Sequence, residues 1–98
     1  MKRIANYTAP APAELNELKK QLGLTSAQMG DLCALGNSDQ FRKYTSPSGK
    51  RLLSVERHFL MAALLRLAPD QVDQVLDEMR RHGAVIELEP LGPKETKI

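Results

Sequence analysis

A helix-start signal and a turn signal lie only a few residues apart, and together they constrain what this 98-residue chain can fold into. Thr25 and Gln28 have the spacing of a capping box, in which two side chains satisfy two backbone N–H groups reciprocally. The inward stripe of the helix follows at helical spacing and consists of Met29, Leu32 and Cys33. Gly36 and Asn37, which tolerate positive φ, then break the pattern. The sequence therefore predicts a short helix that starts at Thr25 and leads into a turn at Gly36 and Asn37.

A second, more polar helix is predicted directly after this turn, over Ser38–Thr45. Ser38 is suited to cap it, and Phe41 and Tyr44 supply its only apolar face, so both rings are expected to plug the core. The remaining side chains point outward: Asp39, Gln40, Arg42 and Lys43. Two short helices joined by a tight glycine-containing turn, the second one polar, are typical of proteins that place a helix in the major groove of DNA. The pattern predicts a helix-turn-helix between residues 25 and 44.

Two longer helices are predicted to flank this pair. The first covers Pro12–Leu22 and ends at Gly23, and its buried stripe is Leu15, Leu18 and Leu22. The other is capped by Ser54 and is expected to be the centrepiece of the core. Its broad apolar surface comprises Val55, His58, Phe59, Ala62 and Leu65. Residues 1–11 precede all of these as a flexible N-terminal arm without apolar periodicity.

A fifth helix and a short strand are predicted in residues 69–90, a segment separate from the DNA-binding unit of residues 12–68. Pro69 ends the preceding helix, Asp70 caps the next one, and Gly83 closes it. The inward residues of this helix are Val72, Val75, Leu76 and Met79. Residues 84–89 then alternate in polarity like a strand, although the chain holds no second strand to pair with. Pro90 and Pro93 mark the tail, residues 91–98.

The segment of residues 24–33 resembles the second helix of lambda-repressor-like domains of the Cro or XRE type, and the similarity extends over residues 14–67. The resemblance implies an all-α, five-helix domain in which Phe41 plugs the core from the recognition helix. Tyr44 stands where the family usually has Trp. Two departures from the family are a turn that is one residue longer, through residues 35–37, and Gly30 in place of the usual Ala.

The same resemblance implies a set of DNA contacts. Gln28 would contact a phosphate, and Asn37, Ser38, Asp39, Gln40, Arg42 and Lys43 would face the groove. Their chemistry suits this role, because Arg42 can pair with guanine, Gln40 with adenine and Asp39 with the amino group of cytosine. Lys50 and Arg51 follow the recognition helix and would add sequence-independent phosphate contacts.

A two-fold dimer is expected, because one helix-turn-helix buries little surface on DNA and the family binds paired half-sites. The expected dimerisation residues lie in the last helix and the strand: Val72, Val75, Met79, Val85, Ile86 and Leu88. The strand would pair with its two-fold mate, which relieves its open edges. The function expected is that of a transcriptional autorepressor of the phage or plasmid type, which binds a palindromic operator. The alternative is a protein-binding adaptor or antitoxin-like module that uses the acidic C-terminal helix and strand.

Charge is distributed unevenly, although the net charge is only +2. Residues 1–58 hold nine Lys or Arg against five Asp or Glu, which gives +4, whereas residues 59–98 hold five against seven, which gives −2. The two halves are therefore expected to face different partners. On charge alone, the basic residues near the second helix are better explained as an ordinary solvated surface, and the two-helix pattern is what favours DNA.

Other classes of function lack their sequence signals. Cys33 is the only cysteine, so it is expected to serve as plain packing, and neither His58 nor His82 has neighbours that would complete a metal site. No apolar run approaches the roughly 20 residues of a membrane span, and the N-terminus lacks a signal core, which predicts a cytoplasmic protein. No phosphate loop, carboxylate pair or nucleophile–histidine motif is present, so no enzyme, cofactor or small-molecule substrate is expected.

Overall fold

Five helices form the secondary structure of the residues that the computed structural model describes, namely 1–35, 38–46 and 51–90, without the side chains of Ser38 and Asp39. They are α1 Pro12–Leu22, α2 Ser26–Leu32, α3 Ser38–Thr45, α4 Val55–Arg66 and α5 Pro69–Arg81. Within these described ranges no strand occurs, so the all-α class is confirmed. The turn predicted at Gly36 and Asn37 and the tail of residues 91–98 lie outside the described residues.

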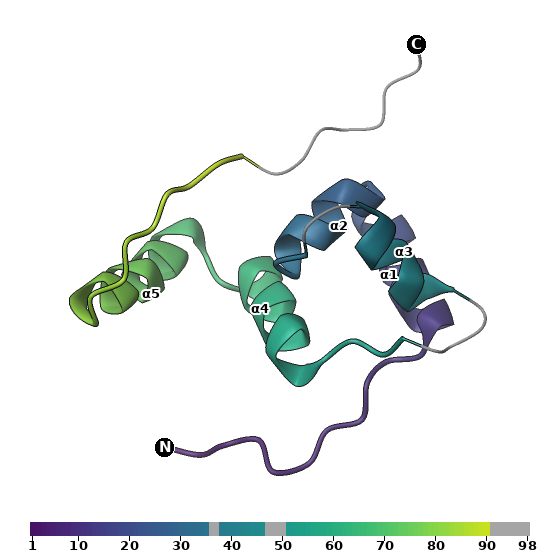
Figure 1. Cartoon of the computed structure of the whole chain (residues 1–98), viewed down its shortest axis with the longest axis horizontal. Helices are drawn as coiled ribbons and strands as arrows, with labels where there is room; N and C mark the ends of the chain where they lie inside the picture. Colours follow the sequence, from purple (N-terminus) through teal and green to yellow (C-terminus); the bar gives the residue numbers. More distant parts are fainter. Residues whose placement is uncertain (36–37, 47–50, 91–98) are drawn as a thin grey trace.

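Helices α1 to α4 surround the hydrophobic core, with α1, α2 and α3 gathered together and α4 beside them (Figure 1). The fully buried apolar side chains are Leu15, Met29, Leu32, Cys33, Phe41, Tyr44, Leu53 and Met61. The inward residues predicted for α2 and α3 are all in this set, which confirms both stripes. Four further side chains pack against it: Leu18, Leu24, Leu35 and Leu64.

Helix α1 has the predicted bounds, because its ends carry strong local signals. Pro12 occupies the first turn, where a missing N–H costs nothing, and Gly23 adopts the left-handed conformation at φ 68° beyond the last turn. The predicted stripe is only partly correct, since Leu22 is 38% exposed. Leu24, one residue past the cap, packs against the core there instead.

Helix α4 faces the core with the side opposite to the one predicted. Met61 is its buried residue, while Phe59 is 65% and Leu65 40% exposed. The helix is apolar nearly all round, so periodicity could not select a face. Two contacts to α2 determine which face of α4 is buried. The Met61 sulfur lies 3.7 Å from the Cys33 sulfur, and Arg57 donates a hydrogen bond to the Cys33 carbonyl at the end of α2. The expectation that α4 is the core centrepiece is therefore wrong, because most of its apolar surface lies outside the core.

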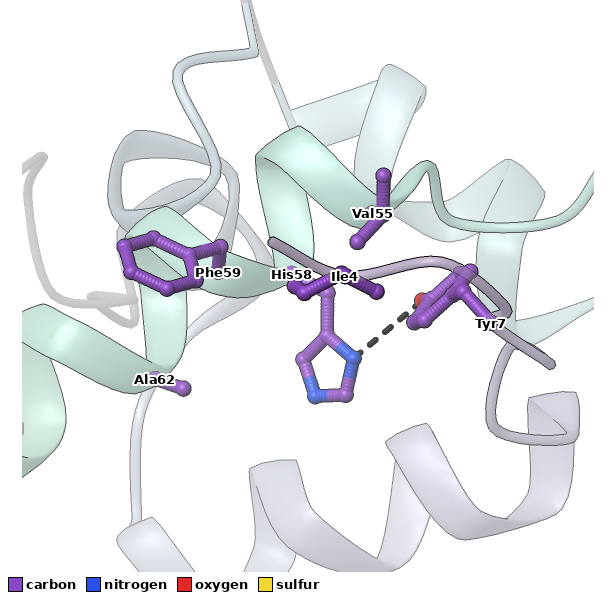
Figure 2. A pocket seen from close by; sticks show the side chains of 6 residues that line it. All are labelled: Ile4, Tyr7, Val55, His58, Phe59 and Ala62. Carbon is purple, nitrogen blue, oxygen red and sulfur yellow. Dashed lines mark hydrogen bonds between the residues drawn. The ribbon is translucent and has the colours of Figure 1, made fainter. Parts of the chain in front are cut away.

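The N-terminal arm covers part of this outward face. Tyr7 donates its hydroxyl proton to the Leu53 carbonyl at 3.0 Å, and Nδ1 of His58 lies 3.1 Å from the same hydroxyl oxygen. Figure 2 shows Ile4 and Tyr7 beside α4, where they help to line an open hollow of about 260 Å³. Burial raises the pKa of the Tyr7 phenol. The arm therefore lies against the outer face of α4 (Figure 2).

Helix α5 begins differently from the prediction. Ala68 is the N-cap and Pro69 the first helical residue, so Asp70 lies inside the first turn and does not cap. The Gln71 side chain caps the helix instead, because its Oε1 accepts a hydrogen bond from the Ala68 N–H at 2.8 Å. Proline is favoured at this first position, since its fixed φ is helical and its missing N–H has no helical partner to lose. Pro69 thus marks the start of α5 rather than the end of the preceding helix.

No residue of α5 is buried, which is the largest departure from the predicted packing. Val75 is 51% and Met79 44% exposed, so their predicted inward face is open to solvent. In Figure 1, α5 stands apart from the α1–α3 cluster, and residues 84–90 run back past it as an extended segment. Val85 in this segment is 94% exposed. Residues 84–89 form no strand in the described chain, and their predicted pairing with a second copy stays a prediction.

Candidate nucleic-acid interface

The start of α2 is fixed by the predicted capping box. The Gln28 N–H donates to Thr25 Oγ1 at 3.1 Å, and the Thr25 N–H donates to Gln28 Oε1 at 3.1 Å. Two backbone donors that have no helical partner are thereby satisfied. This confirms the predicted start of α2.

The end of α2 lies at Leu32, four residues before the predicted turn at Gly36. Ala34 adopts the left-handed conformation at φ 59°, and the Leu35 N–H turns back to the Gly30 carbonyl at 2.8 Å. The Ala34 N–H also donates to the Asp31 carbonyl at 3.2 Å. These two bonds make a Schellman motif, which usually has glycine at the left-handed position. Alanine there carries no turn signal, so the sequence misplaced the end of the helix.

Arg57 on α4 holds this helix end in place. Its Nη1 donates to the Cys33 carbonyl at 3.0 Å and to the Ala34 carbonyl at 2.7 Å. A cation at a helix C-terminus satisfies orphan carbonyls and complements the helix dipole. The role of Arg57 could not be predicted from the sequence, because a long-range contact to main-chain carbonyls leaves no periodic signal. Arg57 is thus a positioning residue for the turn that leads to α3.

Cys33 serves as packing, as predicted. Its side chain is fully buried, and its thiol contacts the Met61 sulfur. Burial raises the pKa of the Cys33 thiol to about 11, while the charge of Arg57 lowers it. The sulfur therefore stays protonated and inert at neutral pH.

Helix α3 is fixed by two aromatic plugs. Phe41 is completely buried and Tyr44 is 6% exposed, which confirms their predicted role. Arg42 and Lys43, on the other side of the helix, are exposed, and the Thr45 hydroxyl donates to the Arg42 carbonyl at 3.1 Å in the last turn. The helix therefore has one face held rigidly and one basic face open to a partner.

The other predicted DNA-contact residues differ in accessibility. Arg51 is exposed and Gln40 is half-buried, whereas Gln28 is only 8% exposed. The Gln28 carbonyl oxygen is engaged in the capping box, so only its amide nitrogen could reach a phosphate. Asn37 and Lys50, and the side chains of Ser38 and Asp39, lie outside the described part of the chain. The structure thus brings Arg42 and Lys43 together on one helix face.

Two of the predicted dimerisation residues, Val72 and Leu88, line a hollow between α5 and α4. Val72 and Leu76 of α5 and Leu88 of the extended segment face Leu60 and Leu64 of α4 across a hollow of about 480 Å³. Ile86 is half-buried. The three others, Val75, Met79 and Val85, are largely exposed. These side chains form an apolar surface that the single chain leaves mostly uncovered.

None of the described helices combines the length and apolar character that crossing a membrane requires. Among the described residues, no three His, Cys, Asp or Glu side chains are grouped so that they could hold a metal ion.

Comparisons of this chain with protein-family models, with curated proteins and with solved structures find no match.

Proposed function

We propose that the protein is a sequence-specific DNA-binding transcriptional regulator whose α3 enters the major groove. The observation that carries this proposal is the division of α3 into a fixed and an open face. Phe41 and Tyr44 are held in the core against α2, while Arg42 and Lys43 are exposed. A short helix presented in this way has the shape and charge to fit the major groove, which admits one α-helix.

The side chains along α3 recognise the bases. Arg42 donates two hydrogen bonds to O6 and N7 of guanine, and Gln40 pairs with N6 and N7 of adenine. Asp39 accepts from N4 of cytosine, and Asn37 and Ser38 make the first contacts at the start of the helix. Lys50 and Arg51 bind phosphates, which adds affinity that falls as salt rises. Gln28 contributes a further phosphate contact through its amide nitrogen.

The fold proposed for this role is the lambda-repressor-like domain. It is supported by the short α2, the following α3 and the two aromatic plugs on α3. The left-handed turn at Ala34, held by Arg57, sets the direction in which the chain leaves α2. The Met61–Cys33 contact then packs α4 against the same helix.

The regulator acts as a homodimer that represses its own or a neighbouring promoter by occupying a palindromic operator in the cytoplasm. The dimer is supported by the exposed apolar residues Val75 and Met79 of α5 and by Val85 and Leu88 beyond it. Residues 84–89 pair as a strand with the same residues of the second copy, since an extended segment has unpaired backbone groups on its edges. Two α3 helices then read two half-sites about one helical turn apart.

Gel retardation of duplex DNA tests the proposal, with Arg42 and Lys43 both changed to Ala. We expect loss of retardation with an unchanged melting temperature, because both side chains are exposed. The matched control changes Lys20 and Arg66 to Ala, which removes the same charge from the exposed ends of α1 and α4. The proposal fails if both double variants bind DNA as the parent does, or if the parent retains no duplex from a random pool at low salt.

A protein-binding adaptor is the second candidate, because α5 buries none of its residues and carries several carboxylates. Such an adaptor would use α5 and the following segment to hold another protein, as an antitoxin does. Failure of all DNA retardation, combined with a monomeric state in solution, would favour this function over the first.

A further inference from the structure

The apolar stripe of α5 is only partly covered in the described chain, with Val75 51% and Met79 44% exposed. It is formed by Val72, Val75, Leu76 and Met79 at i, i+3, i+4 and i+7 spacing. None of these side chains is buried, although such spacing is typical of a helix face that packs against another element. Val72 and Leu76 are half-buried on the side of α4, whereas Val75 and Met79 are left exposed.

The two edges of this stripe carry different charges. Asp73 and Arg80 are seven residues apart, so they lie on the same edge, with opposite charges near its two ends. Arg80 is 42% exposed and pairs with the exposed Asp77 of the preceding turn, at 2.8 Å. The other edge carries Glu78, which pairs with Arg81 and with His82. Each edge is thus distinguishable from the other by its charges.

We propose that two copies pair through α5 in antiparallel orientation, with the two-fold axis near Val75 and Leu76 and Asp73 of each copy opposite the partner's Arg80. This inference rests on the dimer of the proposed function and gives it an orientation and a register. In antiparallel pairing each edge faces the same edge of the other helix, so Asp73 and Arg80 complement each other twice. Val72 then packs opposite the partner's Met79.

Parallel pairing is disfavoured by the same charges. It would bring the edge of Asp73 against the edge of Glu78, and it would gather the acidic first turns at one end and Arg80 and Arg81 at the other. Like charges directly opposite each other destabilise such contacts. Antiparallel helices also align their dipoles favourably.

The extended segment after α5 fits the same axis. Past Gly83 the chain runs back along α5 (Figure 1), and residues 87–90 lie beside Val72 and Leu76. The segments from two antiparallel copies therefore cross the same two-fold axis in opposite directions. This is the geometry that an antiparallel ladder between residues 84–89 of each copy requires.

The test uses two single variants, D73R and R80D, measured by sedimentation equilibrium without DNA. Each variant alone brings like charges together twice in its own dimer, so we expect the dimer dissociation constant to rise about tenfold or more. Mixed in equal amounts, the two variants restore opposite charges at both positions. We therefore expect the mixture to form a heterodimer with a dissociation constant within about threefold of the parent.

Two control variants, D70R and R81D, make the same charge changes on the opposite face of α5. They should leave the dissociation constant within about threefold, and circular dichroism should show equal helix content in all four variants. The inference is overturned if the mixture of D73R and R80D dimerises no better than either alone, or if the parent chain is monomeric. Because no DNA is present, failure of DNA retardation by the parent leaves this readout unaffected.

Discussion

The segment from α1 to α4 and the segment from α5 to residue 90 differ in how far their apolar side chains are buried. The first segment supplies every buried apolar residue of the described chain, from Leu15 to Met61. The second segment buries none in its helix and leaves Val75, Met79 and Val85 largely exposed. Both segments have clear apolar periodicity in the sequence, so periodicity alone does not explain the difference.

The comparison shows that an amphipathic pattern identifies a face but not the surface that covers it. For α2 and α3 the covering surface lies within the chain. The two helices pack against each other, and Phe41 and Tyr44 of α3 belong to the same buried core as the inward side chains of α2. For α5 the cover within the described residues is only partial, because Val72 and Leu76 face Leu60 and Leu64 of α4 across a hollow while Val75 and Met79 stay exposed. If the first segment folds alone and the second needs a partner, substitutions in the two should have very different effects on the monomer.

The largest effect is expected for Phe41→Ala. The ring is fully buried, so its removal leaves a cavity and should lower the free energy of unfolding by about 3–5 kcal/mol. Val75→Ala in α5 should change it by less than about 0.5 kcal/mol at concentrations where the chain is monomeric. Urea denaturation followed by circular dichroism measures both. Equal effects of the two substitutions would contradict the division into a self-sufficient and a dependent segment.

Alkaline pH should weaken the first segment through Cys33. Its folded pKa of about 11 lies above the ordinary value of 9.0, so the folded state holds the proton more tightly. This contribution is fully present below pH 9 and is lost as pH rises through 11, by about 3 kcal/mol in all. The measurement is the difference in pH dependence between the parent and Cys33→Ala. Identical slopes from pH 8 to 11 would show that the thiol is not buried.

Arg57→Ala should lower the free energy of unfolding by about 2 kcal/mol, because it leaves the Cys33 and Ala34 carbonyls without this charged donor. The contrast is Arg80→Ala in α5, which removes an exposed ion pair with Asp77 and should cost less than about 0.5 kcal/mol. Chemical denaturation of both variants gives the comparison. If Arg57→Ala lowers the free energy of unfolding no more than Arg80→Ala does, then Arg57 does not stabilise the turn after α2.

Ala34→Gly is expected to change the free energy of unfolding in the opposite direction. Alanine at φ 59° is strained, so glycine should raise the free energy of unfolding by about 1 kcal/mol. The same substitution at Ala62, inside α4, should lower it by about 1 kcal/mol. Thermal unfolding of the two variants tests this, and a loss of stability in Ala34→Gly would mean that the turn is not left-handed.

The sequence predicted the elements that depend on local signals. The capping box at Thr25, the proline at Pro12 and the glycine at Gly23 each act within one helical turn, and the bounds of α1 and the start of α2 are correct. The same holds for the inward side chains of α2 and α3, because each helix has a single apolar face.

The errors arose where a distant contact decided the outcome. The face of α4 is selected by Arg57 and Met61, which act on residues more than twenty positions away. The turn after α2 depends on an alanine in a conformation that usually marks glycine. Within the candidate DNA interface, the exposure of Arg42 and Lys43 was predictable from helical spacing, whereas the role of Arg57 behind the turn was not.

Selection of bound duplexes from a random DNA pool tests most directly that α3 reads DNA and that α5 joins two copies. We predict an enriched motif that is palindromic, with half-sites roughly 10 base pairs apart from centre to centre. The motif itself would reflect α3, and its two-fold symmetry and spacing would reflect the pairing of α5. An enriched motif without two-fold symmetry would contradict the dimer, and a pool that shows no enrichment at low salt would contradict DNA recognition by this protein.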